Sequence, residues 1–207
     1  MKNYYNTVAG EIFSLAKLEL GTTPLRRQFF YIKPVKLEKS LNTDDLKKTF
    51  WVNIYHAFYL IISNEIKQNN TIFNLKRIKI AGSVLSLNDI EHGILRKCKF
   101  KIGFGNITNP FYSDFIKNVA VNKVDNRIRF ALRDIHLVQN KIDYFDCDLI
   151  EERLAAISKD FIGIESEFDT ELKRIKNPAF LLSYLKNFGR KDSVKKLLET
   201  TSDVDLK

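Results

Sequence analysis

The strongest constraint on the fold is a run from Phe50 to Ile62 that is apolar on nearly every side of a helix. Two neighbouring helical stripes are apolar: Phe50, Ile54, Ala57 and Ile61 form one, and Trp51, Tyr55, Phe58 and Ile62 form the other. A helix with this pattern is buried on most sides. The run contains Asn53 and His56 and is shorter than the roughly 20 residues of a membrane span. We therefore expect a core helix over residues 43–66.

Weaker patterns predict further elements around this helix. Helical spacing of apolar side chains and capping residues predict helices over residues 3–20, 87–96, 109–118, 148–161 and 177–189. Alternating side chains predict strands over residues 76–81, 97–102 and 127–133. The expected fold class is α+β, a mostly helical single domain with a small antiparallel or mixed sheet.

The chain shows no internal repeat and no low-complexity linker. We expect a helical preface over residues 1–42 that packs on the core, a main domain over residues 43–199 and a frayed tail over residues 200–207. The first residues include no apolar stretch as long as that of a signal peptide. This predicts a cytoplasmic protein, or an exported one if a leader has been removed.

Cysteine and histidine are too few for two common kinds of site. Two cysteines, Cys98 and Cys147, do not form a disulfide framework in a chain of this length. A structural zinc site needs four closely spaced ligands, so we expect no metal and no cofactor. Cys98 fits a core position, whereas the acidic neighbours Asp146 and Asp148 should raise the pKa of the Cys147 thiol.

The net charge of +9 arises entirely within residues 1–110, because the remaining residues carry equal numbers of basic and acidic side chains. Such a bias could attract nucleic acid or an anionic membrane surface. The simpler interpretation is a solvated, lysine-rich surface. The same choice applies to two predicted basic strand faces, which consist of Lys97, Lys99 and Lys101 and of Arg127, Arg129 and Arg133. No glycine-rich phosphate loop precedes a predicted helix.

Two groups of polar side chains are candidates for a site. Asn53 and His56 lie three residues apart on the central helix, where they either line a pocket or bind neighbouring backbone. On the helix over residues 87–96, Asp89, Glu91, His92 and Arg96 lie close together. A carboxylate beside His92 would hold the imidazole in one tautomer, as a general base requires. The alternative is an ordinary polar stripe on a helix surface.

Three segments resemble, in the same order, signatures of the mainly bacterial family known as domain of unknown function 547. They read FWVNIYHA over residues 50–57, LNDIEHGILR over residues 87–96 and RIRFAL over residues 127–132. The resemblance covers about residues 43–162, and the family has no established activity. Its usual members carry a histidine in the last signature and cysteines shortly after it. The resemblance thus implies thiol chemistry and a fold akin to papain-like or transglutaminase-like hydrolases.

This chain departs from the family pattern where the chemistry would lie. Arg129 stands at the position of the histidine, and Asp134 stands at the position of the first cysteine. A carboxylate is a far weaker nucleophile than a thiolate in acyl transfer. His56 also stands where the family usually has an asparagine.

These departures lead to a first hypothesis, that the chain is a catalytically degenerate bacterial relative acting as a binding or structural module. Its pocket would hold a small anion, a peptide end or a protein partner. The residues that we expect to bind this ligand are Asn53, His56, His92, Arg96 and Arg129.

Two alternatives remain open. One is a hydrolase of altered mechanism, with His92 as base, Glu91 or Asp89 orienting it, Asp134 as a second carboxylate, and Arg96 or Arg129 binding an anionic group. The other is salt-sensitive binding of nucleic acid or of an anionic membrane surface through residues 76–101.

Overall fold

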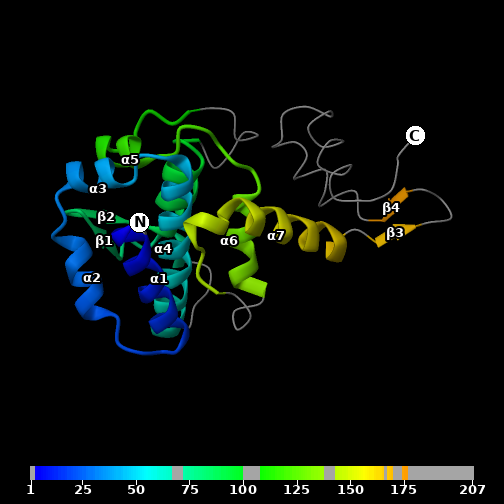
Figure 1. The fold of residues 1–207 in the computed structure, drawn as a ribbon, viewed down its shortest axis with the longest axis horizontal. Helices are drawn as coiled ribbons and strands as arrows, with labels where there is room; N and C mark the ends of the chain where they lie inside the picture. Colours follow the sequence, from blue (N-terminus) through cyan, green and yellow to red (C-terminus); the bar gives the residue numbers. More distant parts are fainter. Residues whose placement is uncertain are drawn as a thin grey trace.

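The protein is seen in a computed structural model that describes residues 3–66, 72–99, 108–137, 143–165, 167–169 and 174–176, with side chains over 3–66, 72–99, 108–133 and 143–160. Helices α1 (Tyr4–Lys17) and α4 (Asp44–Glu65) pack side by side at the centre (Figure 1). On one side of them lie α2 (Thr23–Phe30) and α3 (Pro34–Ser40), and on the other lie α6 (Ile128–Leu137) and α7 (Ile150–Glu165). Helix α5 (Asp114–Val119) packs near α3.

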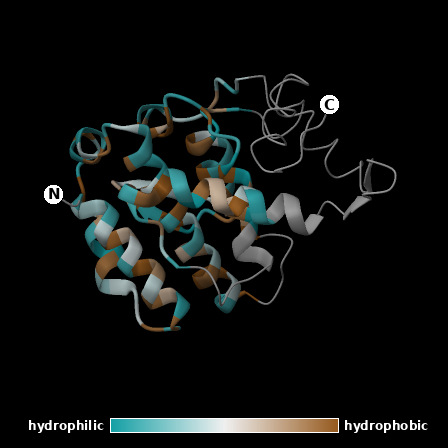
Figure 2. Cartoon of the chain, turned by 45° about the vertical axis from the view of Figure 1, so that its right-hand side comes forward, coloured by the Kyte–Doolittle hydropathy of each residue, from teal (hydrophilic) through white to brown (hydrophobic). Residues whose placement is uncertain are grey.

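Helix α4 is the buried centre of the core, which confirms the prediction from its two apolar stripes. Its N-terminus is capped by Thr43, whose hydroxyl accepts a hydrogen bond from the backbone N–H of Leu46. Every side chain from Lys47 to Leu60 is buried. The outer helices instead alternate between hydrophobic and hydrophilic residues, as expected for helices with one buried face (Figure 2). None of the helices in the described parts of the chain is both long and apolar enough to cross a bilayer.

The first 42 residues form three helices with separate start signals. Asn3 caps α1 by accepting hydrogen bonds from the backbone N–H groups of Tyr5 and Asn6. Proline occupies the first turn of both α2 and α3, where its missing N–H costs nothing. Helix α1 ends at Lys17, and Glu19, two residues later, adopts the left-handed region at φ 57°.

The small sheet is antiparallel. Strands β1 (Ile78–Ile80) and β2 (Ser83–Leu85) pair with Ile78 opposite Leu85, which confirms the strand predicted over residues 76–81. The turn between them places Ala81 and Gly82 at positive φ, and their N–H groups bond to the carbonyls that end α2. A second antiparallel pair is formed by β3 (Glu167–Asp169) and β4 (Arg174–Lys176).

The prediction of a strand over residues 127–133 is wrong, because these residues belong to α6. Over a window this short, the buried positions Ile128, Ala131 and Leu132 fit helical spacing as well as alternation. The hydrogen bonds of the preceding Asp125 decide between a helix and a strand. Its backbone carbonyl accepts from the N–H of Ile128, and its carboxylate accepts from the N–H of Arg127, so the chain enters a helical turn.

The strand predicted over residues 97–102 also does not form as expected. Lys97 and Cys98 both have positive φ, at 52° and 57°, and only an isolated bridge joins Lys99 to Thr108. Residues 100–102 lie outside the described part of the chain, as does the helix predicted over residues 177–189. The predicted helix over residues 109–118 begins at Asp114, after a cap by Ser113.

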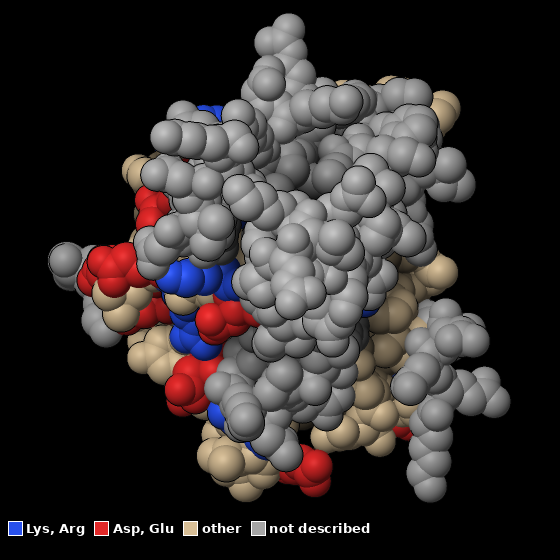
Figure 3. Space-filling view, turned by 90° about the vertical axis from the view of Figure 1, so that its right-hand side faces the viewer, with Lys and Arg blue, Asp and Glu red and all other residues tan. Residues whose placement is uncertain are grey.

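A network of ion pairs joins α4 to α7 and to the turn before α6. Lys48, whose side chain is 7% exposed, contacts Asp45, Asp125 and Glu151, and Arg127 contacts both Asp125 and Glu151. Burial opposes the ionisation of Asp125, but its hydrogen bonds from Arg127 hold the pKa of this carboxyl below its usual range. Figure 3 shows basic and acidic side chains interleaved where this side of the molecule is described.

Candidate functional site

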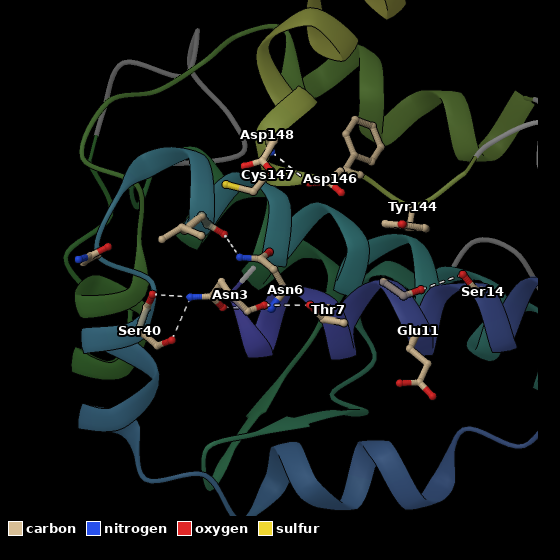
Figure 4. A pocket seen from close by; sticks show the side chains of 14 residues that line it. Asn3, Asn6, Thr7, Glu11, Ser14, Ser40, Tyr144, Asp146, Cys147 and Asp148 are labelled. Carbon is tan, nitrogen blue, oxygen red and sulfur yellow. Dashed lines mark hydrogen bonds between the residues drawn. The ribbon is translucent and has the colours of Figure 1, made fainter. Parts of the chain in front are cut away.

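An open cleft of about 590 Å³ lies between α1 and the segment that leads into α7 (Figure 4). Helix α1 contributes one wall through Asn3, Asn6, Thr7, Gly10, Glu11 and Ser14. The other wall is the segment 144–148, and Ser40, Asn42 and Leu46 complete the lining. Its volume falls within the range of small-molecule sites, about 300–1,000 Å³.

Hydrogen bonds and a close approach at Gly10 fix the α1 wall. The side-chain amide of Asn3 donates to the backbone carbonyl and the hydroxyl of Ser40, at 2.8 and 3.0 Å. The amide of Asn6 donates to the carbonyl of Leu46 at 3.2 Å. At Gly10 a Cβ atom would lie 2.9 Å from the ring of Tyr144, so glycine lets the opposite wall approach the helix.

The opposite wall is held from behind by Asn53. Its carboxamide accepts a hydrogen bond from the backbone N–H of Phe145 at 2.7 Å and donates one to the carbonyl of the same residue at 2.8 Å. Because Asn53 is fully buried, it does not touch the cleft itself. The structure thus places Asn53 one layer behind the cleft, where it positions the wall.

His56, the second polar residue of α4, also lies inside the core. Its ring packs between Phe13 and Phe145, and its Nε2 lies 3.0 Å from the backbone carbonyl of Ala131 in α6. Since a carbonyl only accepts, Nε2 carries the proton. His56 therefore connects α4 to α6, and it does not line the cleft.

Cys147 faces the cleft in a setting that suppresses its reactivity. Burial raises the pKa of the thiol, a hydrogen bond with Thr49 lowers it, and the charges of Asp45, Asp148 and Asp146 raise it further, so that the pKa lies above its usual value. The residues that line this cleft include no histidine. A raised pKa favours the protonated thiol at neutral pH, and among the described residues no histidine lines the cleft to activate it.

A second polar group lies on η2 (Asp89–Leu95), a π-helical turn that begins inside the predicted helix over 87–96. Arg96 Nη1 lies 3.0 Å from His92 Nδ1, and Glu91 Oε1 lies 3.9 Å from the same nitrogen. A guanidinium only donates, so Nδ1 must accept and the ring proton sits on Nε2. This is the opposite of a carboxylate–imidazole pair, in which Nδ1–H donates to the carboxylate.

Helix α4 contributes Tyr55 to the surroundings of Glu91. Burial and then the negative charge of Glu91 raise the pKa of the Tyr55 phenol well above its usual value. Tyr55 is 1% exposed and His92 is 6% exposed. This polar group is therefore largely enclosed.

The Asp89 carboxylate caps the start of this segment instead of pairing with His92. Its carboxylate accepts from the backbone N–H and the hydroxyl of Ser86, at 2.7 and 2.8 Å, and from Lys76 Nζ at 2.6 Å. The Ser86 hydroxyl in turn accepts from the backbone N–H of Asp89. This reciprocal pair is a capping box in which aspartate takes the place of the usual glutamate.

Two of the three positions that depart from the family pattern, Arg129 and Asp134, lie on α6, and the third, His56, lies on α4. Arg129 is half-buried on α6, and Asp134 follows about one turn later, with a side chain outside the described set. The other free thiol, Cys98, is buried, and its pKa is raised mainly by that burial. Of the eight site residues expected from the sequence, the seven whose side chains the structure describes all lie outside the cleft lining, although Asn53 supports its wall.

The residues of the α1 wall were missed by the sequence reasoning. Their spacing contains a signal, because Asn3, Thr7, Gly10 and Ser14 recur every three or four residues and form one helical stripe. Small and polar side chains on one stripe of a partly apolar helix fit a face that borders a cavity. Within the described ranges, no group of three or more histidine, cysteine, aspartate or glutamate residues could hold a metal ion.

Comparison with known proteins gives one match. The model of the family described as "Protein of unknown function, DUF547" matches residues 38–162, which is more than half of the chain. No curated protein and no solved structure matches. A fold akin to papain-like or transglutaminase-like hydrolases therefore stays a prediction.

Proposed function

The chain belongs to the family of proteins of unknown function DUF547, and from this membership we propose that it is a binding module without hydrolase activity, a catalytically degenerate relative. The observation that carries the proposal is the state of Cys147. This thiol faces an open cleft, but it lies among carboxylates, and the described lining residues include no histidine. A nucleophilic cysteine needs the reverse, a lowered pKa or an adjacent base.

The contacts of His92 support the same proposal. With Nδ1 accepting from Arg96, the remaining ring nitrogen carries a proton and cannot remove one from a substrate. Asp89 is engaged in capping, so it does not orient the ring. In this geometry, Arg96 takes the place of the carboxylate that a hydrolase of altered mechanism would need.

The experiment is a panel of thioester, amide and peptide substrates, assayed with the wild type and with His92→Ala and Cys147→Ser. We expect no turnover above background for any of the three proteins. Turnover by the wild type that His92→Ala abolishes would contradict the proposal and favour the enzyme of altered mechanism. Turnover abolished by Cys147→Ser would contradict it in favour of a thiol enzyme.

A further inference from the structure

The charged side chains that line the cleft are all acidic, in a protein whose net charge is +9. They are Glu11 on the α1 wall and Asp146 and Asp148 on the opposite wall. Three described cations near that wall have partners of their own, and one of them, Lys17, contacts Asp143. Lys48 contacts Asp45 and Glu151, and Arg153 donates to the backbone carbonyls of 143 and 144. The cleft is therefore a local acidic surface on a basic molecule.

A buried acceptor in the same cleft gives a second, independent observation. Asn6 lines the cleft and is 8% exposed, and its amide nitrogen is used in the bond to Leu46. Its Oδ1 has no hydrogen-bond donor among the described residues. In Figure 4 the Asn6 carboxamide extends from α1 towards the segment of Cys147. A buried acceptor without a donor costs about 1–3 kcal/mol, so this atom fits a site that receives an N–H group from a ligand.

The arrangement of the acids limits the shape of the ligand. Glu11 lies on α1 with its carboxylate directed away from the segment of Asp146 and Asp148, so the three acids do not converge (Figure 4). Acids that converged on one point would suit a metal ion, but within the described residues no such group exists. Acids spread along a cleft of about 590 Å³ suit an extended ligand with positive charges several ångströms apart.

We propose that this cleft binds an extended aliphatic polycation, either a polyamine or the lysine or arginine side chains of a basic peptide. The proposal rests on the proposed binding function and names its ligand class. Ammonium and guanidinium groups supply both features that the cleft requires, positive charge for Glu11 and Asp148 and N–H donors for Asn6 Oδ1.

The test is an NMR titration of the full ¹⁵N-labelled chain that follows the backbone amides of residues 144–148 and the side-chain amide of Asn6. The cationic probes are spermidine and an acetylated, amidated Lys-Gly-Lys peptide. The matched probes are succinate and an acetylated, amidated triglycine. We expect saturable shifts at these amides with one or both cationic probes, and weaker binding in 0.5 M salt. Spermidine alone would indicate a polyamine, and the peptide alone would indicate a polypeptide ligand.

Two exposed carboxylates provide variants that should leave the fold intact. Glu11→Gln and Asp148→Asn should each weaken binding of the cationic probe by about two- to fivefold, the range for a solvent-exposed ion pair. Asp160→Asn, on an exposed position of α7 outside the cleft, should leave the affinity unchanged.

Three outcomes overturn the proposal. Equal weakening by Asp160→Asn would show a non-specific charge effect, and a response to succinate or triglycine but to neither cation would show another ligand class. A lack of any response also overturns it. The proposed function fails on a different result, namely turnover in the substrate panel, so the two failures are distinguishable.

Discussion

At the scale of single residues, the polar side chains of α4 explain why a buried helix carries asparagine and histidine. Asn53 pairs with both backbone groups of Phe145, and His56 bonds to the carbonyl of Ala131. Each bond satisfies a buried group that would otherwise be destabilising. These residues thus fix two later segments of the chain against α4.

Replacing Asn53 with leucine should lower the free energy of unfolding by about 2–4 kcal/mol, because the buried N–H and C=O of Phe145 would lose their partners. Urea unfolding monitored by circular dichroism measures the change. The exposed Asn118→Ala serves as control and should change stability by less than about 0.5 kcal/mol. A similarly small effect of Asn53→Leu would contradict the positioning role.

The tautomer of His92 is a second prediction at this scale. If Arg96 donates to Nδ1, long-range ¹⁵N NMR should show a neutral ring with its proton on Nε2, as also expected for His56. Arg96→Met should remove this preference and give a mixture of tautomers. A ring protonated at Nδ1 in the wild type would instead support a pair with Glu91, and with it a catalytic base.

The sequence could predict the pKa direction of Cys147 from its acidic neighbours, but it could not predict that this thiol faces a cleft. That placement depends on contacts with residues far away in the chain, such as Asn6 and Gly10 on α1. The sequence could have predicted that Arg96 contacts His92, because the two residues lie four apart on a helix. Which partner occupies Nδ1 depends on the local π-helical geometry and not on spacing.

At the scale of elements, start signals proved more informative than apolar alternation. The caps Thr43 and Ser86 mark the starts of α4 and of the η2 segment, where the sequence placed them. The three residues Ile128, Phe130 and Leu132 alternate, yet they lie in a helix. In a window of six residues, the helical and strand periods share several positions, so the hydrogen bonds of Asp125 decide the outcome.

The capping box at Ser86 gives a prediction for this element. Ser86→Ala should lower the free energy of unfolding by about 1 kcal/mol, because the N–H of Asp89 loses its acceptor. Thermal and urea unfolding measure the loss. Lys76→Ala removes only the exposed ion pair with Asp89 and should cost less than about 0.5 kcal/mol. If both variants lower the free energy of unfolding equally, the capping box does not stabilise the segment.

At the scale of the whole molecule, the network around Lys48 joins α4, α7 and the turn before α6. Hydrogen bonds from Lys48 and Arg127 lower the pKa of Glu151, and hydrogen bonds from Arg127 lower that of Asp125 against the effect of burial. Carboxylates with a lowered pKa stabilise the folded state above their ordinary pKa of about 4. This stabilisation is lost as the pH falls through their pKa in the folded protein.

Asp125→Asn should therefore destabilise the protein at pH 7 by about 1–3 kcal/mol, since Lys48 and Arg127 lose a largely buried partner. The difference from the wild type should shrink as the pH falls from about 4, the ordinary pKa of a carboxyl, through the lowered pKa of Asp125 in the folded protein. Urea unfolding at a series of pH values checks both parts. Glu152→Gln, an exposed neighbour of Glu151, is the control and should follow the wild type. A difference that does not depend on pH would contradict this account.

The bond between Asn53 and Phe145 spans 92 residues of sequence. During synthesis at about 5–20 residues per second, Asn53 would leave the ribosome roughly 5–20 s before its hydrogen-bond partner Phe145. Throughout that interval the largely apolar α4 can pack on α1 but lacks its contacts with the segment around Phe145. Until that segment emerges, the part of α4 that it will cover is exposed apolar surface, which favours aggregation of the nascent chain.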